Sequence, residues 1–373
     1  MKILLLGEYS NVHATLAAGL RRLGHEVCVM SDGDSWKNYP RDVDLSRQGG
    51  FWGRISFLWR LLKALPRMRG YDVVQIINPV FLELKAERMM PFYRYLRRHN
   101  RYMVMGAFGL DYYWVSVNHD LRPMRYSDFN IGDKSRDDAV AMNDFREWVG
   151  TARESLTKAV AADADAIVAG LYEYFVTYEL AEEGRLRDKL SYIPFPIVIP
   201  ENVPLRKTAG KLRVFIGISK GRSAYKGTDI MLRAARRVEA LYPERMELRV
   251  AEGVPFDEYR KMINDSDVLI DQLYGYSPAM NALLAMSKGI VVVGGGEPEH
   301  YDLLGEHELL PIVNVEPSEE SVFKALESLV LHPDKVDGMK QQSVAYVRRH
   351  YDCVQVARQY ERLYLSLSAR KEK

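Results

Sequence analysis

Short apolar runs alternate with helical stretches in both halves of the chain. The pattern is clearest over Asp267–Glu299, where DVLID and IVVV flank the segment AMNALLAMSK. Both apolar runs are typical of strands buried on the two faces of a parallel sheet. The segment between them consists of good helix formers, with Pro278 suited to the first turn and Gly289 to the C-terminal cap. The pattern predicts strand, loop, helix, strand and glycine loop.

A unit of this kind places backbone N–H groups at the carboxyl edge of a sheet, where α/β proteins bind nucleotides and phosphates. The closing sequence GGGEPE (294–299) would let backbone approach a ligand closely. Many α/β proteins carry the same unit as plain scaffold, so the pattern alone leaves both interpretations open.

The N-terminus repeats the pattern. KILLL predicts a strand, residues 12–23 a helix ended by Gly24, and EVCVM a second strand. The intervening GEYSNVH is not GxGxxG, so we expect no dinucleotide cofactor. We expect Gly7, Ser10, Asn11 and His13 at the mouth of the sheet, holding a polar acceptor. The alternative is that Ser10 and Asn11 only cap the helix.

The rest of the first half predicts strands over 71–79, 101–107 and 164–170, with a helix over 86–100 and a long helix over Phe145–Ala162. The tract 112–144 has no steady period, and we interpret it as an insertion that shapes an acceptor pocket. Four prolines in 191–210 indicate a linker. We therefore expect an N-terminal domain over 1–205 and a second domain over 206–349, with a helix at about 350–370 packing back onto the first.

The second half opens with the strand VFIGI and a loop that carries Lys220, Arg222 and Lys226. Thr228 or Asp229 is expected to cap the helix that follows. Cations beside a helix N-terminus form a favourable site for a diphosphate, although a solvated basic loop is the alternative.

Composition narrows the class of protein. The 373 residues are 47% hydrophobic and 27% charged, with a net charge of +2, which suits two soluble globular domains and gives no support to nucleic-acid binding. Cys28 and Cys353 form neither a metal spacing nor a disulfide framework, and no run of 18 apolar residues occurs. HExxH, GxSxG and Walker motifs are absent from the sequence, so we expect no metal. The expected location is cytoplasmic.

One tract departs from this neutral balance. Residues 47–101 hold twelve Lys and Arg against three acids, and FWGRISFLWRLLKALPRMRG interleaves aromatic and basic residues. A basic helix with tryptophan can lie on an anionic membrane surface. It can equally be an outer helix that packs its apolar stripe on the sheet and solvates its charges. The first alternative predicts a peripheral protein at the inner membrane face.

Several of these motifs resemble those of retaining glycosyltransferase family 4 (glycosyl transferases group 1), which has the GT-B fold. YKG followed by TDIMLRAARRV resembles the family's KG segment, SDVLIDQ its aDvfvlPS strand, LAMSKGIVVV its EAMAxGxPVV unit and GGGEPE its GGxxE loop. The resemblance implies two Rossmann-like doubly wound parallel-sheet domains. It also implies a nucleotide-diphosphate sugar as co-substrate, no separate cofactor, and a glycan, lipid-linked or small-molecule acceptor.

The chain departs from the family pattern at three positions. The family's E-x7-E pair falls at Tyr276 and Leu284, and its histidine before Gly109 is Phe108. We expect polar replacements to bind the donor, together with the glycine loop: Lys220, Gln272, Tyr276, Asn281, Gly295, Gly296, Glu297 and Glu299.

The resemblance also implies a mechanism. Arg222 and Lys226 would stabilise the charge that builds on the departing diphosphate, and the leaving phosphate would deprotonate the acceptor. Asp111, in FGLD, completes the expected catalytic set. Because the family's acidic pair and histidine are missing, two alternatives stay open: an inactive GT-B protein that binds a nucleotide or glycan, and a sugar-nucleotide epimerase.

Overall fold

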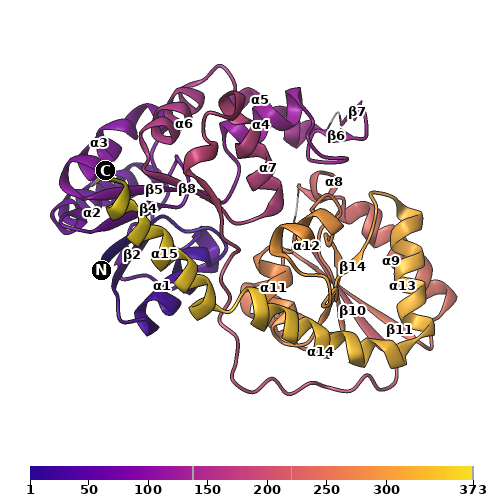
Figure 1. The fold of residues 1–373 in the computed structure, drawn as a ribbon. Coiled ribbons are helices and arrows are strands. Elements are labelled where there is room, and N and C mark those ends of the chain that lie inside the picture. The colour runs from indigo at the N-terminus through magenta and orange to yellow at the C-terminus, as the bar shows by residue number, and fades with distance from the viewer. Residues whose placement is uncertain (137, 220, 372–373) are drawn as a thin grey trace. The chain divides into compact units, whose positions relative to one another are not determined.

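A computed structural model describes residues 1–136, 138–219 and 221–371. The chain forms two compact units whose sequences interleave (Figure 1). Unit 1 comprises Met1–Leu121, Asp144–Val198 and Cys353–Lys373, and unit 2 comprises Arg122–Asn143 and Ile199–Asp352. The chain therefore passes from one unit to the other four times, whereas the sequence interpretation placed 1–205 wholly in the first domain.

Unit 1 is built on a seven-stranded parallel sheet. Leu4 of the inner strand β1 pairs with Cys28 on one side and Val74 on the other, and its side chain is buried. Such burial on both faces explains the unbroken apolar runs in the sequence. In spatial order the strands are β3 (Val43–Asp44), β2 (Glu26–Ser31), β1 (Lys2–Leu6), β4 (Val73–Ile76), β5 (Tyr102–Ala107), β8 (Ala166–Ala169) and β9 (Leu190–Tyr192).

The C-terminal helix returns to unit 1, where it runs beside α1 (Figure 1). A Cβ added to Gly19 of α1 would lie 2.0 Å from the carbonyl oxygen of Cys353, so this contact requires glycine. The hydroxyl of Tyr364 on this C-terminal helix donates to the side chain of Gln75 on β4 at 2.8 Å. The helices that lie wholly in this unit are α1 (Val12–Arg22), α2 (Gly50–Ala64), α3 (Met90–His99), α4 (Tyr112–Asp120), α6 (Ala152–Asp163), α7 (Tyr172–Leu180) and α15 (Cys353–Lys371), while α5 (Ala139–Trp148) is divided equally between the two units.

The long helix predicted over Phe145–Ala162 is wrong. The structure has α5 and α6 instead, and Gly150 between them adopts the left-handed conformation with φ +71°. Thr151 then starts α6, since its side chain accepts the backbone N–H of Arg153 at 3.2 Å. A glycine that ends one helix and a threonine that caps the next are the local signals that the periodicity concealed.

Unit 2 has a five-stranded parallel sheet with a core of aliphatic side chains from its strands and from α9 and α13, which lie side by side. Its strands, in spatial order, are β11 (Met246–Glu252), β10 (Leu212–Ile218), β12 (Val268–Ile270), β13 (Val291–Gly294) and β14 (Val313–Asn314). Its helices are α8 (Ser223–Lys226), α9 (Thr228–Leu241), α10 (Phe256–Asn264), α11 (Met280–Met286), α12 (Pro298–Leu304), α13 (Glu319–Leu331) and α14 (Pro333–His350).

One segment of unit 2 comes from the middle of the N-terminal half. We call residues 122–136 and 138–143 the arm; it contains a two-stranded hairpin of β6 (Asn130–Ile131) and β7 (Lys134–Ser135). The buried side chain of Asn130 holds the arm together by donating to the carbonyls of Met124 and Gly132 at 2.9 and 3.0 Å. The sequence interpretation assigned this tract to an acceptor pocket in the first domain, but the arm packs within unit 2.

The predicted fold class, two Rossmann-like parallel-sheet units, is confirmed. Within the residues that the structure describes, no helix is long and apolar enough to cross a membrane.

A buried ion pair provides a test of unit 2. The Lys340 ammonium lies 2.8 Å from the Asp267 carboxylate at the start of β12, and both side chains are almost fully buried. We expect Lys340→Ala to lower the free energy of unfolding by about 3 kcal/mol, because it leaves a buried carboxylate with fewer partners. The exposed pair Lys324–Glu320 supplies the control, where Lys324→Ala is expected to cost less than about 1 kcal/mol. Urea unfolding curves that give the two variants the same free energy of unfolding would contradict this prediction.

Candidate functional site

The carboxyl edge of the unit 2 sheet gathers most of the predicted donor residues. The strand order changes direction between β10 and β12, and ligands of open α/β sheets bind in the crevice at such a switch point. Gly227, with φ +71°, lets the turn after α8 approach the loop after β12, since a Cβ there would lie 2.6 Å from Leu273. The Leu273 amide donates to the carbonyl of Lys226 at 3.1 Å, which fixes the two loops together.

The cations of the first loop differ in their surroundings. Arg222 immediately precedes α8 and is exposed, with its guanidinium 4.8 Å from the centre of the Tyr225 ring. Lys226 is half-buried at the end of α8. The expected donor residue Lys220 lies outside the described residues. The prediction that Thr228 or Asp229 caps α9 is wrong, because left-handed Gly227 occupies the cap position and no side chain caps it.

The predicted donor residue Asn281 forms a polar chain with Asp271 and Tyr259, which the sequence analysis did not single out, and the Lys226 charge acts on Asp271. The Asn281 amide donates to the Asp271 carboxylate at 3.1 Å, and the Tyr259 hydroxyl donates to Asn281 at 3.3 Å. Burial raises the pKa of Asp271, against the lowering effects of Asn281 and the Lys226 charge. Burial likewise raises the pKa of Tyr259 to about 12. The sequence signal for Asp271 was its place at the end of the run DVLID, at the edge of the sheet.

The glycine loop after β13 packs closely against the protein itself, Gly295 against backbone and Gly296 against a side chain. A Cβ on Gly295 would lie 2.4 Å from the carbonyl oxygen of Gly275, and one on Gly296 would lie 2.7 Å from Ile312. The Gly296 amide, expected near the donor, donates instead to Asn314 at 3.1 Å. Close packing thus accounts for these glycines without a ligand. Gln272 lies half-buried in the facing loop, with its side chain against Gly275.

Glu297 follows the glycine loop and is nearly fully buried. The Tyr126 hydroxyl donates to one of its carboxylate oxygens, and the Arg125 guanidinium lies 2.5 Å from the other. The same guanidinium also pairs with Glu299 and lies 5.3 Å from the centre of the Tyr276 ring. Arg125 and Tyr126 belong to the arm and were not predicted, since nothing in their spacing links them to residues more than 170 positions away.

Tyr276, expected as a donor ligand, is a buried ring of this cluster. Its centre lies 4.7 Å from that of Tyr126, and burial raises its pKa to about 12. Leu284, at the second of the family's acidic positions, is half-buried on α11. Glu297 and Glu299 are therefore the carboxylates of the glycine loop, and the arm contacts both.

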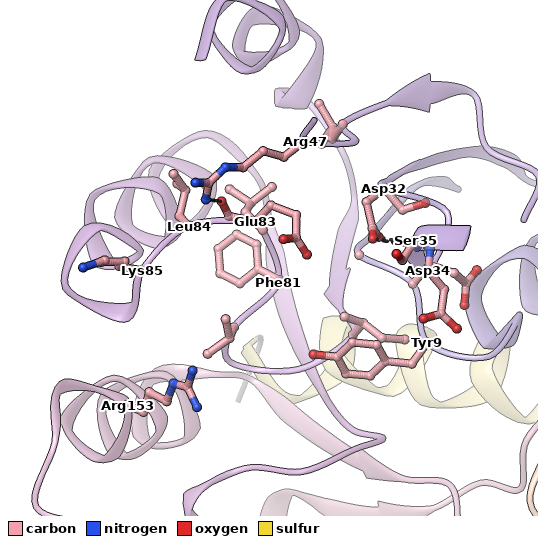
Figure 2. Close-up of a pocket in the computed structure, with 17 residues that line it drawn as sticks. Tyr9, Asp32, Asp34, Ser35, Arg47, Phe81, Glu83, Leu84, Lys85 and Arg153 are labelled. Atoms are coloured by element: carbon pink, nitrogen blue, oxygen red, sulfur yellow. Dashed lines mark hydrogen bonds between the residues drawn. The ribbon is translucent and has the colours of Figure 1, made fainter. Parts of the chain in front are cut away.

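Unit 1 has a pocket of its own, with a volume of about 430 Å³, at the carboxyl edge of β1, β2 and β4 (Figure 2). Figure 2 shows the carboxyl groups of Glu83 and Asp32 facing each other across it, with the Tyr9 ring at its base. Burial, together with the negative charge of Asp32, raises the pKa of Glu83. Arg47 and Arg153 also line the pocket, so it presents both signs of charge to a polar ligand.

Of the four predicted acceptor residues, only Gly7 lines this pocket. His13 is fully buried, with its ring between the carbonyl of Gly7 at 2.8 Å and the Gln75 amide at 3.2 Å. Burial lowers the pKa of His13 to about 3, so the ring is neutral. Ser10 donates its amide to Asp34 at 2.8 Å, beside the pocket.

The alternative capping role expected for Ser10 and Asn11 is wrong. Both adopt left-handed conformations, and the side chain of Asn11 makes no cap hydrogen bond. The Glu8 carboxylate instead accepts the backbone N–H groups of His13 and Ala14 at 3.2 and 2.9 Å. Burial raises the pKa of Glu8 to about 8 despite these hydrogen bonds.

Asp111, expected in the catalytic set, is fully buried at the start of α4. One carboxylate oxygen accepts the backbone N–H of Trp114 at 2.9 Å, and the other accepts the Tyr178 hydroxyl. Burial raises its pKa to about 6. These contacts are those of a helix cap. Across 1–136, 138–219 and 221–371, no group of three or more His, Cys, Asp or Glu side chains is arranged to hold a metal ion.

Neither a protein-family model nor a curated protein sequence matches the chain. Solved structures do match the chain, and the three described here match it along nearly the whole length of both compared chains. HepE (Alr3699) of Anabaena, in complex with UDP and glucose, has a TM-score of 0.60 at 13% identity and is matched over 98% of this chain and 100% of its own.

Two further solved structures extend the comparison. The catalytic domain of starch synthase IV from Arabidopsis thaliana, bound to ADP and acarbose, has a TM-score of 0.59 at 13% identity, with 99% of each chain covered. Sucrose-phosphate synthase from Thermosynechococcus elongatus has a TM-score of 0.57 at 14% identity, with 99% of this chain and 100% of its own covered. The resemblance read from the motifs is thus matched in three dimensions, and the chain has the GT-B fold.

Proposed function

We propose that the chain is a glycosyltransferase that moves a sugar from a nucleotide-diphosphate sugar to a hydroxyl-bearing acceptor, with retention of configuration and without a metal. The observation that carries the proposal is the whole-length likeness to HepE in complex with UDP and glucose. The starch synthase bound to ADP supports the same class of donor. The cation-bearing loop at the switch point of unit 2 supports the placement of the diphosphate there.

Arg222 and Lys226 are the proposed catalytic cations. In the reaction the bond between the sugar C1 and the diphosphate oxygen breaks, and negative charge builds on the leaving group. Exposed Arg222 and half-buried Lys226 would contact that charge and stabilise the transition state more than the ground state. The acceptor oxygen bonds to C1 on the same face, and its proton passes to the leaving phosphate, so no separate base is needed.

The unit 1 pocket is the proposed acceptor site. Glu83 and Asp32 would accept hydrogen bonds from acceptor hydroxyls, while Arg47 and Arg153 would contact anionic groups. Because Asp111 and His13 are buried in structural hydrogen bonds, we no longer assign them a direct role in this site.

A membrane surface is the proposed location of the acceptor. Helix α2 packs on unit 1 through Gly53, Phe57, Leu61 and Ala64, while its opposite face carries large apolar side chains. Phe51, Trp52 and Trp59 are 69%, 78% and 62% exposed, and Leu58 and Leu62 extend the same stripe. The plain outer-helix alternative requires α2 to bury its apolar residues against the sheet. Helix α2 instead leaves these five apolar side chains exposed.

The cations around this stripe support an anionic lipid surface. Arg54, Lys63 and Arg67 are exposed on or just after α2, and the Lys63 ammonium lies 5.7 Å from the Trp59 ring centre. Tryptophan rings are favourable at the level of lipid headgroups, and each cation near an anionic surface adds about 1 kcal/mol. We propose that α2 lies on the cytoplasmic face of a membrane and brings the chain to a lipid-linked acceptor.

The diphosphate site can be tested by charge removal. We expect Arg222→Ala combined with Lys226→Ala to weaken the binding of UDP or ADP by at least about 100-fold, because each charge-assisted hydrogen bond is worth about 1.5–3 kcal/mol. Calorimetry with both nucleotides is the measurement. Arg236→Ala with Lys324→Ala removes two cations from the exposed faces of α9 and α13 and should leave binding unchanged. Equal affinity in the two double variants would refute the placement of the diphosphate.

The membrane contact can be tested with vesicles. We expect the chain to sediment with vesicles that contain phosphatidylglycerol and far less with neutral ones. Trp52→Ser with Trp59→Ser should weaken this binding by about tenfold or more, since each exposed ring loses its apolar contact with lipid. Leu241→Ser, at an exposed position on α9, is the control. Sedimentation that is insensitive to lipid charge and to the tryptophans would remove the membrane from the proposal.

The activity itself is tested with radiolabelled UDP-, GDP- and ADP-sugars. Transfer to an added acceptor, or slow hydrolysis of one donor, is the expected result. Binding of a nucleotide sugar without either reaction would favour an inactive binding protein, which the missing acidic pair motivates. Epimerised donor recovered from the same assay would favour the isomerase alternative.

A further inference from the structure

We propose that Arg125 and Tyr126 of the arm position the Glu297 carboxylate to receive a pair of neighbouring hydroxyl groups of the donor. The inference rests on the proposed function and adds to it two residues and a segment that the sequence assigned to the acceptor side. In this role Arg125 and Tyr126 are positioning residues, and Glu297 is the residue that contacts the donor.

Glu297 lies at the carboxyl edge of the unit 2 sheet. It directly follows the glycine loop at the carboxyl end of β13. Strand β13 pairs with β12, which is one of the two strands at the switch point. The Glu297 backbone N–H donates to the carbonyl of Tyr276 at 3.1 Å, so the carboxylate leaves the sheet edge at a fixed place. The two positions where the resemblance calls for acidic side chains hold Tyr276 and Leu284. Glu297 is a carboxylate at this same edge of the sheet.

Two side chains of the arm hold the Glu297 carboxylate in place. The Glu297 side chain is only 5% exposed, and each of its oxygens already has one partner: the Tyr126 hydroxyl on one and the Arg125 guanidinium on the other. A carboxylate oxygen accepts two hydrogen bonds, so each retains one lone pair in a fixed direction. Two parallel acceptor positions match two neighbouring hydroxyls, as in a ribose or a hexose.

The arm also contacts α8 and the loop after β12. The Arg136 guanidinium donates to the carbonyls of Ala224 and Tyr225 at 3.0 and 3.2 Å and lies 3.6 Å from the Tyr274 ring centre. The Tyr225 hydroxyl donates to Asp128 at 2.6 Å. The arm thus contacts α8, which carries the diphosphate cation Lys226, and also the loops after β12 and β13.

These contacts join the proposed diphosphate and hydroxyl ligands in one frame. The arm fixes the distance between the α8 loop and Glu297, and rigid support of this kind is what a precise binding site requires. A merely structural arm would need the same packing contacts but not the Tyr126 hydroxyl, which adds a hydrogen bond to a carboxylate that Arg125 already neutralises.

The test uses the full-length chain and two variants. Tyr126→Phe keeps the ring against Tyr276 but removes the hydroxyl from Glu297, and Arg125→Lys keeps the charge but cannot reach Glu297 and Glu299 as a fork. We expect each to raise the Kd of the nucleotide sugar that the native chain binds best by about tenfold, with KM rising more than kcat falls. Arg122→Ala is the control, since its side chain donates within the arm, to the carbonyl of Asp133 and to Ser135.

Paired ligands identify which hydroxyls are bound. If Glu297 receives the ribose, UDP and UDP-glucose lose affinity equally in Tyr126→Phe; if it receives the hexose, UDP-glucose alone loses affinity. ADP and ADP-glucose serve in the same way if the native chain prefers adenine nucleotides. Either result supports the proposal.

Other outcomes overturn it. A Kd within twofold of the native value in both variants, with a lowered Tm, would make the arm a purely structural element. A tighter Kd would mean that the arm covers the site. If the native chain binds no nucleotide sugar, the proposed function and this inference both fail, whereas native binding with unaffected variants removes this inference alone.

Discussion

Close backbone packing at the carboxyl edge of the unit 2 sheet is the constraint on which the candidate site depends. Gly227 against Leu273, and Gly295 against the carbonyl of Gly275, bring three loops nearer to one another than any Cβ would permit. The loops that carry Lys226, Asp271 and Glu297 meet because of these contacts. The glycines thus act first on the protein's own backbone, and the polar side chains next to them are left to face a ligand.

Local patterns predicted the elements and the fold class. The buried parallel strands are recognisable in the sequence as apolar runs. The end of each run marks the sheet edge, where polar residues gather. Hence the sequence indicated the edge of unit 2 and the cations at Arg222 and Lys226. Helical periodicity over 145–162 predicted one long helix, which is wrong. Gly150 ends α5 and Thr151 caps α6, so these two residues divide the segment.

Contacts between residues far apart in the sequence could not be predicted. His13 was expected at the mouth of the sheet and Asp111 was chosen because FGLD resembles a family motif, yet Gln75 and Tyr178 hold them in buried hydrogen bonds. Glu8 replaced the expected caps of α1 because its carboxylate reaches two backbone N–H groups while Ser10 and Asn11 adopt left-handed conformations. The arm is the largest such case, since aromatic and charged residues without a period give no sign of which sheet they join.

The arm also decides how this protein can be divided. A fragment cut at the proline linker and before α15 would contain residues 199–352 and lack the arm. In that fragment Glu297 would lose both side-chain partners, the Arg125 guanidinium and the Tyr126 hydroxyl, and the Tyr276 ring would lose its packing against Tyr126. Exchange of unit 2 between chains of this fold, by recombination or by design, therefore requires a two-segment graft in which the hairpin of the arm travels with residues 199–352. The sequence that builds unit 2 is discontinuous in the gene.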